Sequence, residues 1–258
     1  MLTTTVVVAP FEASELKISR AKRHITELDG RISEFIARKT LGLVVEQGPK
    51  PGDKCLVVRL REQVPSDLSP IVGDAIHNLR AALDLLACEL VRLNGASDKN
   101  VQFPFSNDGS NLKEMIKHHK VDRASSDVIE LIRSLKPYSG GNNALRSIHD
   151  LDIIDKHRTL IPVFEMVEAA PFTNGHALFQ NIRVAPIEDG VPIMPLPRDS
   201  GFEIGQEISG LLHLRFPRDT PLAGHEIVPT LHDLAELVTR IVEIFRAHCL
   251  GQQDGQPD

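Results

Sequence analysis

Tryptophan is absent from the 258-residue sequence, and tyrosine occurs only once. Proteins that bind single-stranded nucleic acids by stacking need exposed aromatic rings, so this composition disfavours that mode although ten phenylalanines are present. An excess of basic charge is also lacking, since the formal net charge is -6 and the pI is near 6.0. Broad binding to a phosphate backbone requires uncompensated Lys and Arg. Only a local basic groove remains compatible with such a ligand.

Cysteine is scarce, with three widely spaced residues, Cys55, Cys88 and Cys249. This odd number disfavours a disulfide framework and a Cys-rich zinc site, and it is typical of a reducing compartment. No apolar run approaches the roughly 18 residues that a membrane-spanning helix needs. The first ten residues also lack the basic and apolar regions of a secretion signal. We therefore expect a cytoplasmic protein that does not contact a membrane.

The most informative pattern is a long helix expected over residues 70–94, with Ser69 as its N-cap, Pro70 in its first turn and Gly95 at its end. Most of its surface is apolar, but a single polar stripe interrupts it, formed by Asp74, His77, Arg80 and Asp84. At about 100° per residue, the stripe covers about a third of the circumference. Arg80 and Asp84 are four residues apart and can form an ion pair.

A second polar cluster lies in a helix expected over residues 143–160 and contains Arg146, His149, Asp150, Asp152, Asp155, His157 and Arg158. Arg146, Asp150, Ile153 and His157 share one face of this helix, whereas His149, Asp152 and Lys156 lie on another. Single histidines among apolar neighbours are more often satisfied core residues than catalysts. Two polar helices can nevertheless meet, because burying so many polar groups requires mutual hydrogen bonding or a ligand.

The remaining patterns predict an α+β fold, a bundle of long helices packed beside antiparallel strands. They indicate amphipathic helices at 14–39 and 229–249, a hairpin of strands 41–46 and 54–60 around a Gly-Pro turn, short helices at 111–119 and 126–135, and a β-meander over 161–216. We expect one domain over residues 1–250, made of a helix and hairpin (14–61), a helical part (69–160), the meander (161–216) and the last helix (229–249). A flexible tail would follow at 251–258.

These residue types predict a pocket between the two polar helices. His77 and His157 would donate or accept protons, Arg80 and Arg158 would hold an anion, and carboxylates would orient them. We assign catalytic roles to His77, Arg80, Asp84 and His157, and ligand-binding roles to Asp74, Asn78, Asp155 and Arg158. The expected ligand is the phosphate of a nucleotide or of RNA. The neighbouring His118 and His119 fit an exposed helix end instead.

Two alternatives to the pocket remain open. The same polar residues are also typical of a structural network in a non-enzymatic scaffold or homodimer. Asp74 and His77 have a spacing that suits a metal-dependent hydrolase, but the sequence contains no zinc-protease motif, no calcium-binding loop and no Walker lysine loop. We therefore expect neither a metal nor a cofactor.

The segments Gly73-Asp74-Ala75-Ile76-His77-Asn78-Leu79-Arg80-Ala81-Ala82-Leu83-Asp84 and Ile154-Asp155-Lys156-His157-Arg158 resemble the hallmark segments of a family of uncharacterised bacterial proteins. The resemblance covers most of the chain and implies no established activity. A more distant similarity is to HEPN-type helical proteins, in which an Arg followed after four to six residues by a His supports metal-independent RNA cleavage. Arg80 matches that Arg, but the helix contains no matching His, and Leu85 stands at the fifth position.

Overall fold

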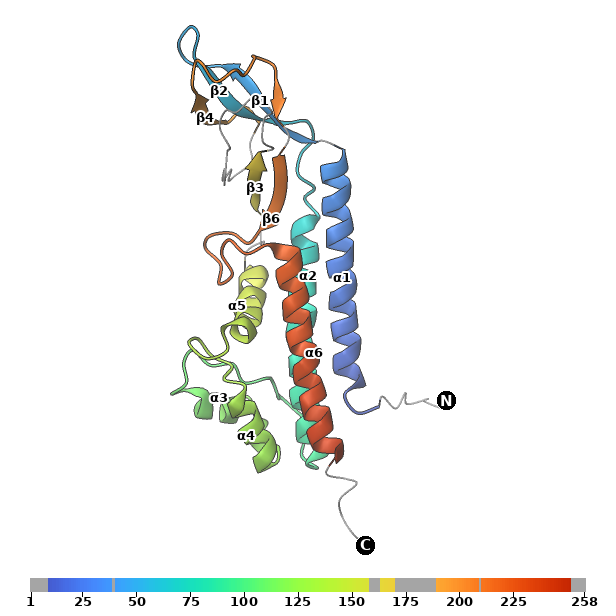
Figure 1. The fold of residues 1–258 in the computed structure, drawn as a ribbon. Helices are drawn as coiled ribbons and strands as arrows, with labels where there is room; N and C mark the ends of the chain where they lie inside the picture. The colour runs from blue at the N-terminus through green and yellow to red at the C-terminus, as the bar shows by residue number, and fades with distance from the viewer. Residues whose placement is uncertain (1–8, 39, 158–162, 170–188, 209, 252–258) are drawn as a thin grey trace, which may run out of the picture. The chain divides into compact units, whose positions relative to one another are not determined.

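A computed structural model describes residues 9–38, 40–157, 163–169, 189–208 and 210–251. Long helices and antiparallel strands occur together (Figure 1), so the predicted α+β class is confirmed. Among the described residues, no helix is both long enough and apolar enough to cross a membrane.

Three helices of similar length carry most of the apolar core: α1 (Glu12–Ala37), α2 (Leu68–Leu93) and α6 (Ile227–Gly251). The buried residues of α1 recur at steps of three and four, as the sequence predicted, so one side of the helix faces the core. Lys22 pairs with Glu236 at 2.6 Å, and Arg246 pairs with Glu15, so α1 and α6 lie side by side and antiparallel.

The ends of α2 show how local sequence sets the boundaries of a helix. The helix begins at Leu68, so Ser69 lies inside it rather than at the predicted N-cap. Pro70 still lies in the first turn, where its missing N–H costs nothing. At the other end Gly95 has a positive φ of 71°, and the Ala96 N–H donates to the Val91 carbonyl. Gly95 therefore ends the helix in a Schellman motif, as predicted.

Between α2 and α6 the described residues form four short helical elements: α3 (Leu112–His118), η1 (Val121–Arg123), α4 (Ser126–Ser134) and α5 (Asn143–His157). The α5 helix contains the second polar cluster. Its buried residues are Leu145, Ser147, Ile148, Leu151 and Asp152. Ile153 is 41% exposed, so the buried side of α5 is the side that carries Asp152.

The strands that the structure describes form two antiparallel sheets. The hairpin of β1 (Leu41–Gln47) and β2 (Lys54–Leu60) has the predicted bounds, apart from one residue, and lies at the centre of a sheet with the order β4-β2-β1-β5. In that sheet β4 spans Pro192–Leu196, and β5 spans Glu207–Ile208. A separate pair joins β3 (Val163–Ala169) to β6 (Gly210–Arg215).

The predicted β-meander is therefore wrong in its connections, although most of its strands exist. Consecutive strands of a meander are neighbours, whereas here β4 and β5 join the early hairpin, and β3 pairs with the later β6. Alternation of apolar residues identifies a strand but not its partner. The run predicted at 177–185 and the tail after residue 251 lie outside the described residues.

The chain divides into two compact units. The first comprises residues 1–26, 71–159 and 229–258, and the second comprises 27–70 and 160–228. The polar stripe of α2 and the whole of α5 belong to the first unit, whereas all the described strands belong to the second. The single domain expected from the sequence stays a prediction.

Candidate functional site

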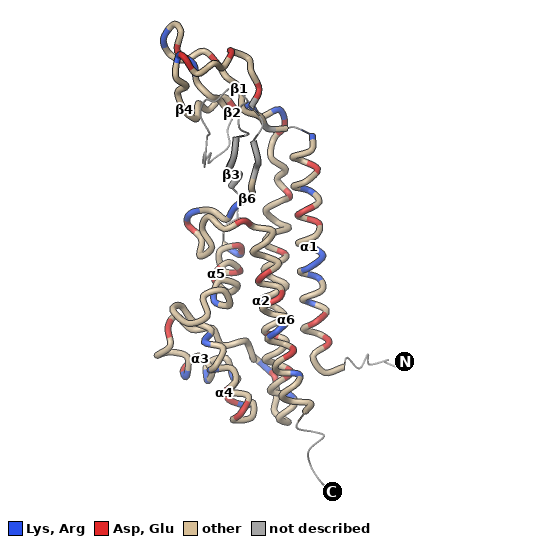
Figure 2. Tube along the Cα trace, viewed as in Figure 1, with Lys and Arg blue, Asp and Glu red and all other residues tan. Residues whose placement is uncertain are grey.

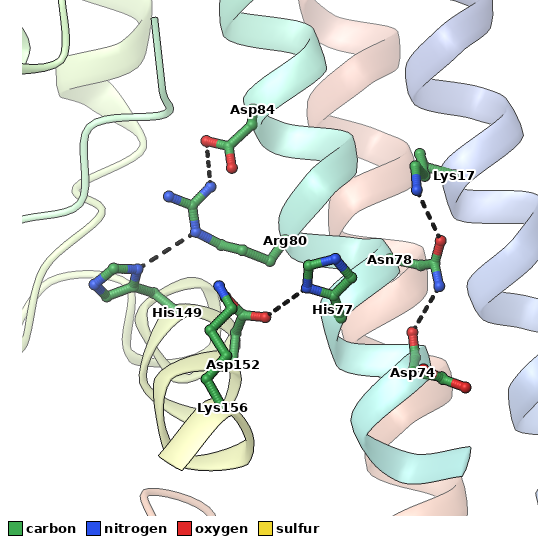
Figure 3. A network of polar contacts seen from close by, with 9 residues as sticks. All are labelled: Lys17, Asp74, His77, Asn78, Arg80, Asp84, His149, Asp152 and Lys156. Atoms are coloured by element: carbon green, nitrogen blue, oxygen red, sulfur yellow. Dashed lines mark hydrogen bonds and ion pairs between the residues drawn. The ribbon is translucent and has the colours of Figure 1, made fainter. Parts of the chain in front are cut away.

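Helices α2 and α5 meet in an antiparallel pairing at three points. An added Cβ at Gly73 would lie 2.3 Å from an Asp155 carboxylate oxygen, His77 bonds Asp152, and Arg80 bonds His149. Positions 73, 77 and 80 follow helical steps of four and three, and 155, 152 and 149 follow steps of three in the reverse direction. The two polar segments singled out in the sequence are therefore facing sides of one helix pair (Figure 3).

Asp152 is the centre of the contact between these helices. Its side chain is only 5% exposed, yet it binds two side chains that are more than half exposed. His77 Nδ1 lies 2.9 Å from Oδ1, and Lys156 Nζ lies 2.5 Å from Oδ2. A carboxylate accepts only, so the proton of neutral His77 is on Nδ1 and Nε2 is left as an acceptor. Asp152 thus holds an imidazole and an ammonium group side by side at the surface (Figure 3).

Arg80 lies one turn further along α2, and its side chain is 8% exposed. Its Nε donates to His149 Nδ1 at 3.4 Å, and its guanidinium carbon lies 4.7 Å from the centre of the Phe105 ring. Nη1 lies 2.5 Å from Asp84 Oδ1 but forms no well-aligned hydrogen bond. Arg80 and Asp84 therefore interact through charge attraction, without an aligned hydrogen bond at Nη1.

His149 is held in its neutral form. Burial, followed by the positive charges of Arg80 and Arg146, lowers its pKa from 6.5 to about 4. Its ring stacks on Phe105, with centroids 4.8 Å apart. Because Nδ1 accepts the hydrogen bond from Arg80, the proton of neutral His149 is on Nε2. This tautomer lets a histidine lie against an arginine without charge repulsion.

The segment that contains Phe103 and Phe105 is attached to both helices. Asp84 of α2 accepts a hydrogen bond from the Phe103 N–H at 2.8 Å. Arg146 of α5 donates to the Ser106 carbonyl at 2.6 Å and binds Asp150 through Nε and Nη2. These bonds fix Phe105 beside the Arg80 guanidinium, where the apolar ring excludes water from one side of the charge.

Asn78 and Asp74 belong to a different contact. Asn78 Nδ2 donates to the Asp74 carbonyl at 2.8 Å, and its Oδ1 accepts from Lys17 of α1 at 3.4 Å. Asn78 is buried, and Asp74 is exposed (Figure 3). Asn78 therefore connects α2 to α1 rather than to α5, and the ligand-binding roles assigned to both residues stay predictions.

The predicted residues at the end of α5 are placed less closely to the cluster. Asp155 packs on Gly73, and His157 is exposed in the last turn of the helix. Arg158 lies outside the described residues. The structure thus brings together His77, Arg80 and Asp84 on the side of α2 that meets α5, with Asp155 against Gly73, but it does not show His157 beside His77. Their catalytic and binding roles are untested.

No site role was predicted for the face of α5 that meets α2. The sequence places His149, Asp152 and Lys156 on one face, but the predicted site residues of this segment were Asp155, His157 and Arg158. His119 was predicted to lie at an exposed helix end, without a role in the site. Burial and the nearby His118 and Arg80 lower its pKa, so His119 lies within electrostatic reach of the cluster. Only the fold could reveal that proximity.

Metal ligands are not gathered at this cluster. No group of three or more His, Cys, Asp or Glu residues in the described ranges is arranged to hold a metal ion. Lys156 and Arg80 already occupy the carboxylates of Asp152 and Asp84 with positive charge. The donor set around His77 therefore suits hydrogen bonding better than metal coordination.

Compared with known proteins, the chain matches no family model, no curated protein and no solved structure at a significant level. The resemblance to uncharacterised bacterial proteins and the similarity to HEPN proteins stay expectations from the sequence. Any function must therefore be inferred from the geometry of the helix pair.

Proposed function

We propose that the α2–α5 helix pair binds the phosphate group of a nucleotide or of RNA, and that His77 exchanges a proton with the bound ligand. One observation carries this proposal: the buried Asp152 carboxylate orients two exposed, nitrogen-bearing side chains, His77 and Lys156. A surface ladder of ion pairs would not require a carboxylate that is 5% exposed. Burying a carboxylate is costly unless hydrogen bonds and an opposite charge compensate it. His77 and Lys156 supply this compensation, and both are thereby held in fixed positions at the surface.

The proton chemistry belongs to His77. Its Nδ1 is fixed on Asp152, which aligns the ring, while its exposed Nε2 is available to a ligand. A histidine oriented in this way by a carboxylate is a common arrangement in general acid–base catalysis. Lys156 supplies the adjacent positive charge, with two further N–H groups beyond the one that points to Asp152.

Arg80 adds a second source of N–H groups. Its Nε and Nη1 face His149 and Asp84, whereas Nη2 makes no hydrogen bond with the residues that the structure describes. Asp84 and His149 thus orient the guanidinium without using all of its donors. In this proposal Arg80 holds the anion, as the sequence predicts, and Asp155 and His157 have supporting roles at the edge of the site.

Local charge limits the size of the ligand contact. Arg80, Arg146 and Lys156 are each paired with a carboxylate, so the cluster has little excess positive charge. Figure 2 shows acidic and basic residues mixed along α1 as well, rather than a continuous basic face. The proposal is therefore a contact with one or two phosphates.

The test is a binding titration with fluorescein-labelled single-stranded RNA, and with unlabelled AMP and ATP as competitors. We expect His77→Ala and Lys156→Ala to weaken RNA or nucleotide binding at least tenfold, because each removes one oriented donor. Both side chains are more than half exposed, so the melting temperature should change little. His232→Ala and Lys113→Ala remove exposed residues elsewhere in the same unit and should leave affinity within twofold.

A result in which neither RNA nor nucleotides bind the unmodified protein would overturn the proposal. The same holds if His77→Ala and Lys156→Ala bind as tightly as the control variants. Should His77→Ala lose its fold, His77→Gln supplies a second variant, because its amide can still contact Asp152 but cannot exchange a proton.

A second candidate function is a structural scaffold, and one observation favours it. Arg80 contacts Asp84, His149 and Phe105 at once and is nearly buried, as in a polar network that fixes two helices. Under this alternative His77→Ala would leave every ligand assay unchanged, and replacement of Arg80 would lower stability. Analytical ultracentrifugation would then show whether the amphipathic helices assemble into a homodimer.

A further inference from the structure

The second unit contains a cavity that has no part in the proposed phosphate site. It has a volume of about 740 Å³ and lies against the sheet, between the turn of the β1–β2 hairpin and the edge strand β4. We call it the sheet cavity. Its apolar lining includes Val57 of β2 and Ile193, Met194 and Leu196 from β4. Cavities that hold small organic ligands commonly measure about 300–1,000 Å³, so the sheet cavity has a suitable size.

The charged residues around the sheet cavity are already paired inside the protein. Glu46 binds Arg59 at 2.5 Å, and Asp53 receives two hydrogen bonds from Arg198, at 2.7 and 2.9 Å. The Lys54 ammonium donates to the Phe202 carbonyl. A charged ligand would have to displace one of these pairs or remain unpaired, which carries an energetic cost. The cavity is therefore electrostatically complementary to an uncharged molecule.

The edge strand argues against a peptide as the occupant. Strand β4 pairs with β2 on one side, and Pro192 and Pro195 have no N–H to offer on either side. Peptides commonly bind sheets by adding a strand along such an edge, and prolines in an edge strand prevent that addition. A compact molecule that enters between the strand and the hairpin turn does not need those N–H groups.

We propose that the sheet cavity binds a small, uncharged, mainly apolar organic molecule. Its hydrocarbon or aromatic body would lie on Val57, Ile193, Met194 and Leu196, and burial of that surface would drive binding. Cys55 lines the same cavity, directly opposite Glu46 in the hairpin. Its thiol is half-buried and donates weakly to the Gln47 carbonyl, so it reports whether the cavity is occupied.

The probe for the test is N-phenyl-1-naphthylamine, which is uncharged and fluoresces when it enters an apolar site. We expect saturable binding of one molecule per chain. In the unmodified protein, N-ethylmaleimide labelling followed by mass spectrometry should show that the probe slows modification of Cys55 at least fivefold. Cys88 and Cys249 are also half-buried but do not line the cavity, so their labelling rates serve as internal controls.

A matched pair of variants locates the binding site. Ile193→Trp should fill the cavity and weaken probe binding at least tenfold, whereas Ile204→Trp, at an exposed position outside the cavity, should bind as the unmodified protein does. The anionic 1-anilinonaphthalene-8-sulfonate should bind more weakly than the uncharged probe. Unchanged labelling of Cys55 at saturating probe would overturn the proposal even if Ile193→Trp failed to fold. Equal or tighter binding of the anionic dye would contradict the assignment of an uncharged ligand.

Discussion

His149 shows how a single residue acquires an unusual state from its surroundings. It lies against Arg80, stacks on Phe105 and is followed on α5 by Asp150 and Asp152. Burial and the two arginines oppose protonation more strongly than the carboxylates favour it, so its pKa is lowered to about 4. The same imidazole in an unfolded chain titrates near 6.5.

This difference predicts a pH-dependent stability. Between pH 6.5 and 4 the unfolded chain takes up a proton that the folded chain does not, so the free energy of unfolding decreases as the pH falls through this range. After allowance for the partial exposure of His149, the loss is about 2 kcal/mol. Urea unfolding at several pH values would measure it. His149→Gln, which can still accept from Arg80, should reduce the slope, and an identical slope in both proteins would contradict the prediction.

Gly73 supports a second prediction at this scale. A methyl group at this position would meet the Asp155 carboxylate at 2.3–2.5 Å, so Gly73→Ala should destabilise the protein by about 1–3 kcal/mol through overpacking. In an Asp155→Ala background the obstruction is gone. Because Ala is the better helix former by about 1 kcal/mol, the same change should then stabilise. Thermal unfolding of the four proteins would show this change of sign, and equal effects in both backgrounds would rule out the contact.

At the scale of elements, the helices were predictable, but their partners were not. The repeat of apolar residues located α1, α2 and α6 to within a few residues, because a helix that packs on one side must repeat every three to four positions. The strands of the later segment were also visible as alternating runs. Their assignment to two sheets depended on pairing between distant segments, which alternation does not encode.

The candidate site was predictable to a similar extent. The sequence indicated that the two polar segments meet, and the α2 residues at the contact were the predicted His77 and Arg80. It did not indicate which side of α5 would face them, because both sides carry His and Asp. In the structure, the side of α5 that faces α2 lies next to the buried residues Leu145, Ile148 and Leu151. The apolar residues near His157 favoured a buried histidine, but His157 is exposed and Ile153 is 41% exposed.

Asp84 provides a prediction about the element that follows α2. Its carboxylate joins Arg80 to the Phe103 N–H, so Asp84→Ala should leave a nearly buried guanidinium and a backbone donor without this partner. We expect a loss of about 2 kcal/mol in the free energy of unfolding. Asp84→Asn should lose less, because an amide oxygen can still accept from Phe103. Chemical denaturation would measure both, with the exposed Asp122→Ala as control. Equal losses of unfolding free energy for Asp84→Asn and Asp84→Ala would show that Asp84 acts through its charge alone and not through its hydrogen bond to Phe103.

At the scale of the whole molecule, the charge distribution constrains how a phosphate ligand would bind. The net charge is -6, and the cations of the helix pair are matched by carboxylates. Long-range attraction of a polyanion is therefore not expected. Any binding must come from a few directed contacts.

The salt dependence of RNA binding measures the number of phosphate contacts. For single-stranded RNA each phosphate contact contributes about -0.7 to the slope of log K against log salt concentration. One or two contacts thus predict a slope between about -0.7 and -1.4. Fluorescence anisotropy titrations over a range of NaCl concentrations would provide it. A slope steeper than about -3 would indicate a wide basic surface, which the net charge and the paired cations of the cluster do not supply.

The pairing of α2 with α5 also determines which changes of length the chain can accept. The two helices meet at three pairs of residues: Gly73 with Asp155, His77 with Asp152, and Arg80 with His149. These contacts require that the spacing of the residues within each helix is kept. Deleting one residue from either helix would turn everything beyond it by about 100° and separate the remaining partners. Other chains that share this arrangement should therefore be recognisable by two matched intervals, even when few of their remaining residues agree.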